Sequence, residues 1–303
     1  MGPGEWPGHL FIRTACRGSA GALGRPLARR SLHGIAPIEK ISPPRLSDSP
    51  RNFRSAFSLV ELLAAVAILI ILGGVTFAVG HRVYAASSLA VSANNIRQLA
   101  AGGAAYLADN NYNFWPFFQK TSEGHRWWFG LEPKSALGRS EGSRIIDMAA
   151  GPLGPYIPRG MAPDPSLRTS GTAFKPKFEF GYIGCGYNVL LANGWETLDR
   201  PGAKKPVRFW SLADPAKTVM FATSAQVNTF QRPASASKPM IEEFYGIDER
   251  EVTVHGRHGG NAMVAFASGN AGFLPIDKST IDRRAPKANI GRFAPRGNTL
   301  YLK

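Results

Sequence analysis

One carboxylate, Glu61, lies near the start of a long apolar segment, SAFSLVELLAAVAILIILGGVTF, at positions 55–77. A charged carboxylate in hydrocarbon costs on the order of a few kcal/mol, and less near the membrane interface, unless a cation meets it. No Lys, Arg or His occurs over positions 57–80, so the side chains of this segment supply no cation. Two interpretations follow: Glu61 is hydrated at headgroup depth, or it is a contact residue that meets a cationic group from elsewhere.

The sequence HGRH places His255 and His258 three residues apart, next to glycines. Two histidines at this spacing can reach one metal ion, or His258 can contact a glycan, but zinc sites usually add Cys or carboxylate ligands. The alternative is structural: the ring of His258 bonds the backbone of a following hairpin and fixes its turn. We favour this structural role, with His255 as an ordinary surface residue, and we expect no metal or other cofactor.

Five aspartates lie apart from one another in turn-like sequences, namely Asp164, Asp199, Asp214, Asp248 and Asp277. Asx turns, in which the side chain bonds the backbone two residues on, explain them without chemistry. No nucleophile elbow, phosphate loop or pair of catalytic carboxylates occurs in the sequence. We therefore expect a protein that is not an enzyme.

The apolar segment predicts a transmembrane helix. Glu61 is the only charged residue over positions 57–79, and at ~1.5 Å per residue a helix of that length spans a ~30 Å hydrocarbon core. Arg51 and Arg54 precede it, which predicts a cytoplasmic N-terminal side and an exported remainder. Small and apolar residues then recur at helical spacing, as Leu89, Ala93, Ile96, Leu99, Ala100, Gly103 and Leu107. The sequence predicts one helix over 57–108, with a transmembrane half at 57–80 and a second half packed against a globular domain.

The helix divides the chain into three parts. Residues 1–56 carry nine Lys or Arg against three acidic residues and are rich in Pro, Gly and Ser, which is typical of an unfolded leader. Residues 109–303 predict an exported α+β head, with strands at 218–225 and 262–267 and a hairpin turn at 268–270. We expect its aromatic clusters to form the core: Trp115, Phe117, Phe118, Trp127, Trp128 and Phe129.

Composition narrows the choice of partners. The formal net charge is +15, which would suit nucleic acid. The part of the chain after residue 56 has no dense basic run, so we expect no nucleic-acid binding. The two cysteines, Cys16 and Cys185, lie far apart and define no disulfide framework.

A basic leader, a small residue and then FSLVELL open the apolar helix at positions 57–63. This junction resembles the cleavage and methylation signal of type IV prepilins and type II secretion pseudopilins. The resemblance implies that a prepilin peptidase cuts between Ala56 and Phe57 and methylates the new amino group of Phe57. Glu61 becomes the fifth residue of the mature chain, where the carboxylate in this family meets the cationic amino terminus of a neighbouring subunit. The chain departs from the family in having Ala56 where Gly is usual, and in its long leader.

The segment RHGGNAMVAFASGNAGF places His258, nine further residues and then Ser268 and Gly269. It resembles a C-terminal signature of bacterial pseudopilin-like proteins, in which His and nine residues are followed by Asp-Gly. Ser268 replaces the aspartate, which weakens the case for a cation site because a hard ion such as calcium prefers carboxylate oxygen.

Together these resemblances imply a pilin-like α+β fold, with one long N-terminal transmembrane helix packed on a small antiparallel β-sheet head. They imply a structural subunit of a type IV pilus-like filament or type II secretion pseudopilus, with prepilin peptidase, other pilin subunits and the membrane as partners. The expected location is the bacterial inner membrane, with a cytoplasmic N-terminus and a periplasmic head, or a cell-surface filament. The alternative is a membrane-anchored periplasmic glycan- or metal-binding protein that does not assemble.

Overall fold

The computed structural model describes residues 58–157, 160–168, 171–179, 183–195 and 205–295. The predicted leader, 1–56, and its cleavage junction between Ala56 and Phe57 lie outside these residues.

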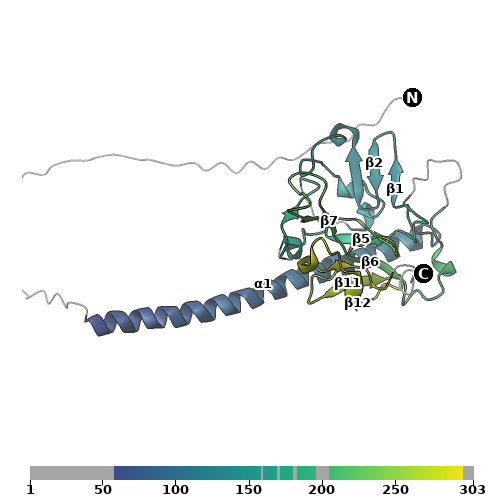
Figure 1. Ribbon diagram of the computed structural model, residues 1–303. Helices are drawn as coiled ribbons and strands as arrows, with labels where there is room; N and C mark the ends of the chain where they lie inside the picture. The colour runs from purple at the N-terminus through teal and green to yellow at the C-terminus, as the bar shows by residue number, and fades with distance from the viewer. Residues whose placement is uncertain (1–57, 158–159, 169–170, 180–182, 196–204, 296–303) are drawn as a thin grey trace, which may run out of the picture. The chain divides into compact units, whose positions relative to one another are not determined.

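The dominant element is a single helix, α1 (Leu59–Asp109), of 51 residues (Figure 1). It ends where Asn111 and Tyr112 adopt left-handed φ angles of 53° and 57°. The Tyr112 amide donates to the Leu107 carbonyl at 2.8 Å, which satisfies one of the carbonyls that a helix end leaves unpaired. The predicted continuous helix is confirmed over the described residues. It runs without a break past position 80, where we expected the membrane-spanning half to end.

The two halves of α1 have different surroundings. The first half extends away from the rest of the described residues (Figure 1), and its large apolar side chains are exposed. The second half packs on the sheet strands β6 and β11 and on short 3₁₀ helices, with Ile96 and Leu99 fully buried. The predicted one-sided pattern is therefore confirmed. Three polar residues that the apolar pattern did not include, Ser88, Ser92 and Asn95, are buried on the same face.

A five-stranded sheet lies against this second half, in the order β12-β11-β6-β5-β9. Its strands are β5 (Cys185–Asn188), β6 (Val219–Thr223), β9 (Gly246–Ile247), β11 (Asn261–Phe266) and β12 (Ala271–Pro275). All neighbours are antiparallel except β5 and β9. The predicted strands at 218–225 and 262–267 are β6 and β11, and the predicted hairpin is β11 with β12. These strand predictions are confirmed.

Three smaller sheets complete the described part of the head. They are β1 (Phe118–Lys120) with β2 (Gly124–Trp127) and β3 (Gly130–Pro133); β4 (Phe174–Lys175) with β8 (Met240–Glu242) and β7 (Gln226–Asn228); and β10 (Val254–His255) with β13 (Ile290–Gly291). The 3₁₀ helices are η1 (Lys134–Ala136), η2 (Met148–Ala150), η3 (Gly154–Tyr156), η4 (Pro165–Arg168), η5 (Phe209–Ser211), η6 (Lys278–Thr280) and η7 (Pro286–Ala288). The head is thus α+β and mostly antiparallel, but it divides its strands among several sheets and contains two parallel pairs, β5/β9 and β4/β8.

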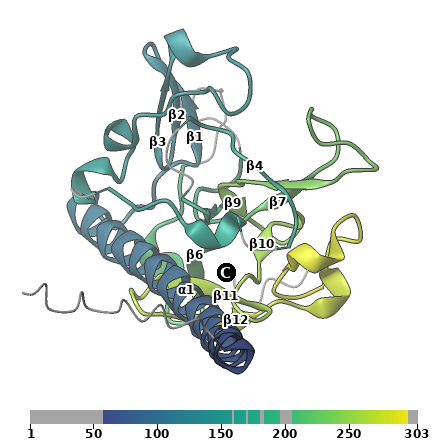
Figure 2. The ribbon, with the colours of Figure 1, turned by 90° about the vertical axis from the view of Figure 1, so that its left-hand side faces the viewer.

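The core of the head is aromatic. Trp115 stacks on Tyr187 with ring centroids 4.8 Å apart, and Trp128 lies 5.2 Å from Phe221. The Trp128 indole N–H donates to the Tyr245 carbonyl at 2.6 Å, so the buried ring keeps its polar atom paired. Figure 2 shows the β1–β2–β3 sheet at the end of the head opposite β11 and β12, which lie beside α1. The predicted core role is confirmed for Trp115, Phe117, Trp128 and Phe129, whereas Phe118 and Trp127 are only partly buried.

Candidate functional site

The first half of α1 presents an apolar surface with Glu61 in its first turn. Leu62, Leu69 and Ile70 are between 60% and 69% exposed, and the most apolar stretch of the helix has none of its residues buried. By length and composition α1 is able to cross a membrane. So large an exposed apolar surface is unstable in water and requires lipid or protein around it. Glu61 is also exposed, so this surface carries an acidic group at its beginning.

The segment that resembles the C-terminal signature contains β11, and its histidine and serine lie at opposite ends of this strand. His258 precedes the strand and Ser268 follows it, and six strand residues span roughly 20 Å. The two residues therefore form no common site. Within the part of the chain that the structure describes, no group of three or more His, Cys, Asp or Glu side chains is arranged to hold a metal ion.

Ser268 and Gly269 form the turn of the β11–β12 hairpin. Gly269 has a φ of +92°, a backbone conformation that favours glycine because it lacks a Cβ. Its amide donates to the Phe266 carbonyl at 2.9 Å, and the Ser268 amide donates to the Pro215 carbonyl at 3.0 Å. The Ser268 hydroxyl bonds the side chain of Asn270. The Ser-Gly pair thus has a structural role in the turn.

His258 acts through its backbone more than through its ring. Its amide donates to the Asn261 carbonyl, and its carbonyl accepts from the Asn261 amide, each at 3.2 Å. The ring packs edge-on against Phe273 at 6.3 Å, and its Nε2 has no hydrogen-bond partner among the described residues. The predicted bond from the ring to the hairpin backbone is replaced by these backbone bonds. Burial, with the nearby Arg257 as the second cause, lowers the pKa of His258 to about 4.

The prediction that His255 is an ordinary surface residue is wrong, because His255 is completely buried. It lies in β10, which pairs with β13 far along the chain. Its Nδ1 lies 3.3 Å from the Arg257 guanidinium. Burial and then the Arg257 charge lower the pKa of His255 well below its usual value, so the ring is neutral at physiological pH.

A buried ion pair that we did not predict joins the residue before η4 to the loop before β11, and α1 contacts it through Ser92. The Arg257 guanidinium lies 3.3 Å from the Asp164 carboxylate, and both side chains are at most 1% exposed. Asp164 also accepts a hydrogen bond from the Ser92 hydroxyl of α1 at 2.6 Å and from the Ser166 amide at 2.9 Å. Burial alone would raise the pKa of Asp164, but Arg257 and the serine donors hold it below its usual value. The spacing of Ser88, Ser92 and Asn95 along the buried helix face was the one sequence signal for such a contact.

The other described aspartates form the predicted Asx turns. Asp214 accepts from the Ala216 amide, Asp248 from the Arg250 amide and Asp277 from the Ser279 amide, at 3.0, 2.8 and 2.8 Å. Asp164 makes this contact in addition to its ion pair, and Asp199 lies outside the described residues. Cys185 is unpaired and buried, and burial raises the pKa of its thiol to about 12. It is therefore no nucleophile.

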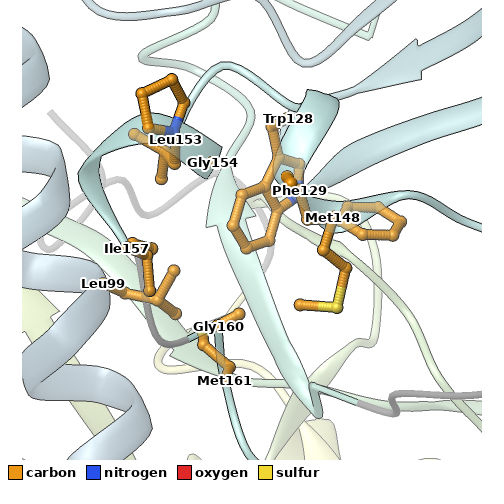
Figure 3. Close-up of a pocket in the computed structure, with 11 residues that line it drawn as sticks. Leu99, Trp128, Phe129, Met148, Leu153, Gly154, Ile157, Gly160 and Met161 are labelled. Atoms are coloured by element: carbon orange, nitrogen blue, oxygen red, sulfur yellow. The ribbon is translucent and has the colours of Figure 1, made fainter. Parts of the chain in front are cut away.

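Two of the hollows that adjoin α1 combine it with segments of the head. An apolar pocket of about 310 Å³ lies between Leu99 of α1 and the η2–η3 region. Figure 3 shows Leu99 and Ile157 on one side of it and Trp128, Phe129 and Met148 on the other. A second hollow, of about 750 Å³, lies nearer the exposed half of the helix, and its walls come from α1, η4, the loop before β11, and β12. We call this second hollow the helix–loop groove.

No protein-family model matches the chain, and searches of the curated proteins and of the solved structures likewise find no match.

A buried charge network occupies the β4–β8–β7 sheet. The Glu242 carboxylate lies 2.9 Å from Lys175 Nζ and 2.7 Å from Asn228 Nδ2. Its neighbour Glu243 is also fully buried, and one of its oxygens accepts from the Lys177 amide at 2.7 Å. Burial raises the pKa of Glu243 to about 7 despite this hydrogen bond. Glu243 is therefore protonated in the folded state under mildly acidic conditions.

The raised pKa of Glu243 predicts a pH dependence of stability. An acid whose folded pKa exceeds its unfolded value stabilises the fold at low pH, and this contribution is lost as the pH rises through the folded pKa. We expect the free energy of unfolding to fall by roughly 2–3 kcal/mol between pH 5 and 8 for this group. The Glu243→Gln variant should lack this fall and be more stable than the wild type at pH 8.

Denaturant unfolding of the full chain in detergent micelles at pH 5 and pH 8, followed by tryptophan fluorescence, measures this effect. Glu251→Gln, at an exposed position, is the control for removing one charge. Equal pH profiles for the wild type and Glu243→Gln would contradict the role of Glu243.

Proposed function

We propose that this protein is a membrane-anchored, pilin-like structural subunit that assembles into a pilus-like filament or secretion pseudopilus. The observation that carries the proposal is the helix α1. It is one uninterrupted helix, its first half is apolar and exposed with Glu61 in the first turn, and its second half is built into the head. In this role the protein works through packing and has no catalytic activity of its own.

The exposed half of α1 suits two successive environments. Before assembly, lipid covers its apolar side chains. After assembly, the same surface packs against the corresponding helices of neighbouring subunits. Since the consecutive residues Leu69, Ile70 and Ile71 point in directions about 100° apart around the helix and are all exposed, neighbours can cover it from more than one direction.

Glu61 would set the position of each incoming subunit. A carboxylate on an apolar helix surface gains most from a cation that arrives together with the covering helix, because the pair is then shielded from water. The amino terminus created by cleavage before Phe57 is such a cation. We propose prepilin peptidase as the enzyme that creates and methylates it, with the peptide bond between Ala56 and Phe57 as its substrate.

The basic residues before the helix give the proposed orientation. Arg51 and Arg54 precede the apolar span, so the leader is placed in the cytoplasm and the head in the periplasm of a bacterial inner membrane. This orientation presents the junction to the peptidase at the cytoplasmic side of the membrane.

The proposal is tested by the mass of the mature chain. The protein is extracted from membranes of cells with and without prepilin peptidase, and its intact mass and N-terminal sequence are determined. We expect a chain that begins at methylated Phe57 when the peptidase is present, and a chain that retains the leader when it is absent. The Phe57→Ser variant, which alters the first mature residue, serves as a second probe of the junction.

A chain that retains residues before Phe57 in both strains would contradict the proposal. It would favour an anchored periplasmic binding protein, for which Glu61 is dispensable and no filament forms.

A further inference from the structure

The helix–loop groove combines aromatic rings with polar side chains. Its volume of about 750 Å³ lies within the ~300–1,000 Å³ typical of small-molecule sites. Tyr84 of α1 and Phe273 of β12 line it and are 49% and 50% exposed. Rings that are half exposed keep a flat apolar face available to a ligand.

Three polar atoms on groove-lining residues have no hydrogen-bond partner among the described residues: Ser88 Oγ, His258 Nε2 and Arg257 Nε. Ser88 is one of the residues that line the groove, and it is only 5% exposed. Buried polar atoms are nearly always paired with protein, water or ligand, so unpaired ones that gather at one hollow indicate a place where a ligand supplies the partner.

The groove carries little net charge. The Arg257 guanidinium is already paired with the Asp164 carboxylate at 3.3 Å, and His258 is neutral because burial lowers its pKa to about 4. No acidic residue is among the described residues that line the groove. An anion would meet a cation that is already compensated, and a cation would meet no carboxylate, so the groove suits an uncharged ligand.

We propose that the helix–loop groove binds a neutral oligosaccharide. A sugar ring has a face of C–H bonds, which stacks on aromatic rings such as Tyr84 and Phe273, and an edge of hydroxyl groups. These hydroxyls both donate and accept, which matches Ser88 and the Nε2 of a neutral His258. The α1 residues of the groove begin just beyond the apolar half of the helix. In the proposed orientation, a glycan near the periplasmic face of the inner membrane therefore lies within reach. The proposal concerns the single subunit and does not depend on filament assembly.

Binding to the full chain tests the proposal. The protein is held in lauryldimethylamine oxide micelles, because a detergent with a sugar headgroup would compete. Cellotetraose and the tetramer of N-acetylglucosamine are the probes, measured by titration calorimetry and by saturation-transfer NMR. We expect the wild type to bind at least one of them with a micromolar to millimolar Kd.

Two matched pairs of variants locate the site. Ser88→Ala and Phe273→Ala should each weaken binding by about tenfold, because each removes one hydrogen-bonding group or one stacking face. Ser87→Ala changes the neighbouring exposed serine, and Phe230→Ala removes an exposed ring elsewhere. Both control variants should bind as the wild type does. Since Ser88→Ala places a good helix former within α1, its loss of binding cannot be ascribed to unfolding.

Three results would overturn the proposal. They are the absence of binding of both sugars by the wild type, equal binding by the wild type and both groove variants, and full competition by inorganic phosphate. A Phe273→Ala variant that dissociates a self-associated species in the absence of sugar would assign the groove to a second copy of the chain instead.

Discussion

Replacing Arg257 with methionine is expected to lower the free energy of unfolding by about 3–5 kcal/mol, because it leaves a buried carboxylate without its cation. Asp164 is completely buried and lies 3.3 Å from the guanidinium. The remaining donors, which are the Ser92 hydroxyl and the amide and hydroxyl of Ser166, are neutral and compensate only part of the lost charge. Denaturant unfolding of the full chain in micelles, followed by the fluorescence of the buried tryptophans, measures the loss.

The double variant Asp164→Asn/Arg257→Met is the matched test of this explanation. It removes both charges, and a neutral replacement of a buried ion pair is often close to neutral for stability. We therefore expect it to recover most of the loss. Lys217→Met, which breaks the exposed pair with Asp214, should leave the free energy of unfolding almost unchanged, because solvent screens an exposed pair. An effect that small for Arg257→Met would show that water reaches Asp164 and that the pair is not a buried one.

Replacing Glu61 with leucine is expected to abolish most filament formation while leaving membrane insertion intact. The substitution removes a charge from an apolar segment, so insertion becomes easier. The proposed contact with a neighbouring amino terminus is lost, and a charge-assisted hydrogen bond contributes about 1.5–3 kcal/mol, or tenfold or more in each association step. Quantification of sheared filaments and of membrane-bound protein in the same cells separates the two effects.

Thr76→Val provides the control for this experiment. Thr76 also lies in the exposed half of α1, but its hydroxyl bonds the Leu72 carbonyl of the same helix at 2.7 Å and needs no partner from another subunit. We expect filament yield to be unchanged in this variant. Filaments at wild-type yield in the Glu61→Leu variant would show that Glu61 does not set the position of the incoming subunit. The assembly proposal would then lose a main support.

Periodicity could predict two kinds of element. One is an element that pairs with a segment near it in sequence, and the other is an element whose surroundings are apolar throughout. The helix α1 follows from an apolar segment and a one-sided continuation, and both depend only on local spacing. The β11–β12 hairpin follows from two apolar runs joined by a short turn, where Gly269 supplies the backbone angle that the turn requires. These features need no knowledge of the remaining fold.

The buried polar contacts could not be predicted in this way. His255 is buried because β10 pairs with β13, two short strands whose sequences carry no alternation that would reveal the pairing. Arg257 lies beside Asp164 because the fold brings the loop before β11 next to the residue before η4. Nor does the sequence tell which serine on the buried face of the helix has a hydroxyl without a hydrogen-bond partner among the described residues, as Ser88 does. Each of these contacts joins residues that are distant along the chain, and a local pattern carries no information about a distant partner.

The lack of any break in α1 has a mechanical consequence. The helix is continuous from Leu59 to Asp109, and its second half contacts both β6 and β11. A pull on the membrane-side end therefore loads the helix–sheet contacts in parallel, as shear, so that many must yield together. The ion pair of Asp164 and Arg257 and the hydrogen bond of Ser92 to Asp164 lie at the loaded end of this contact, where they resist the first slip. A chain built in this way transmits tension to its head without a compliant hinge.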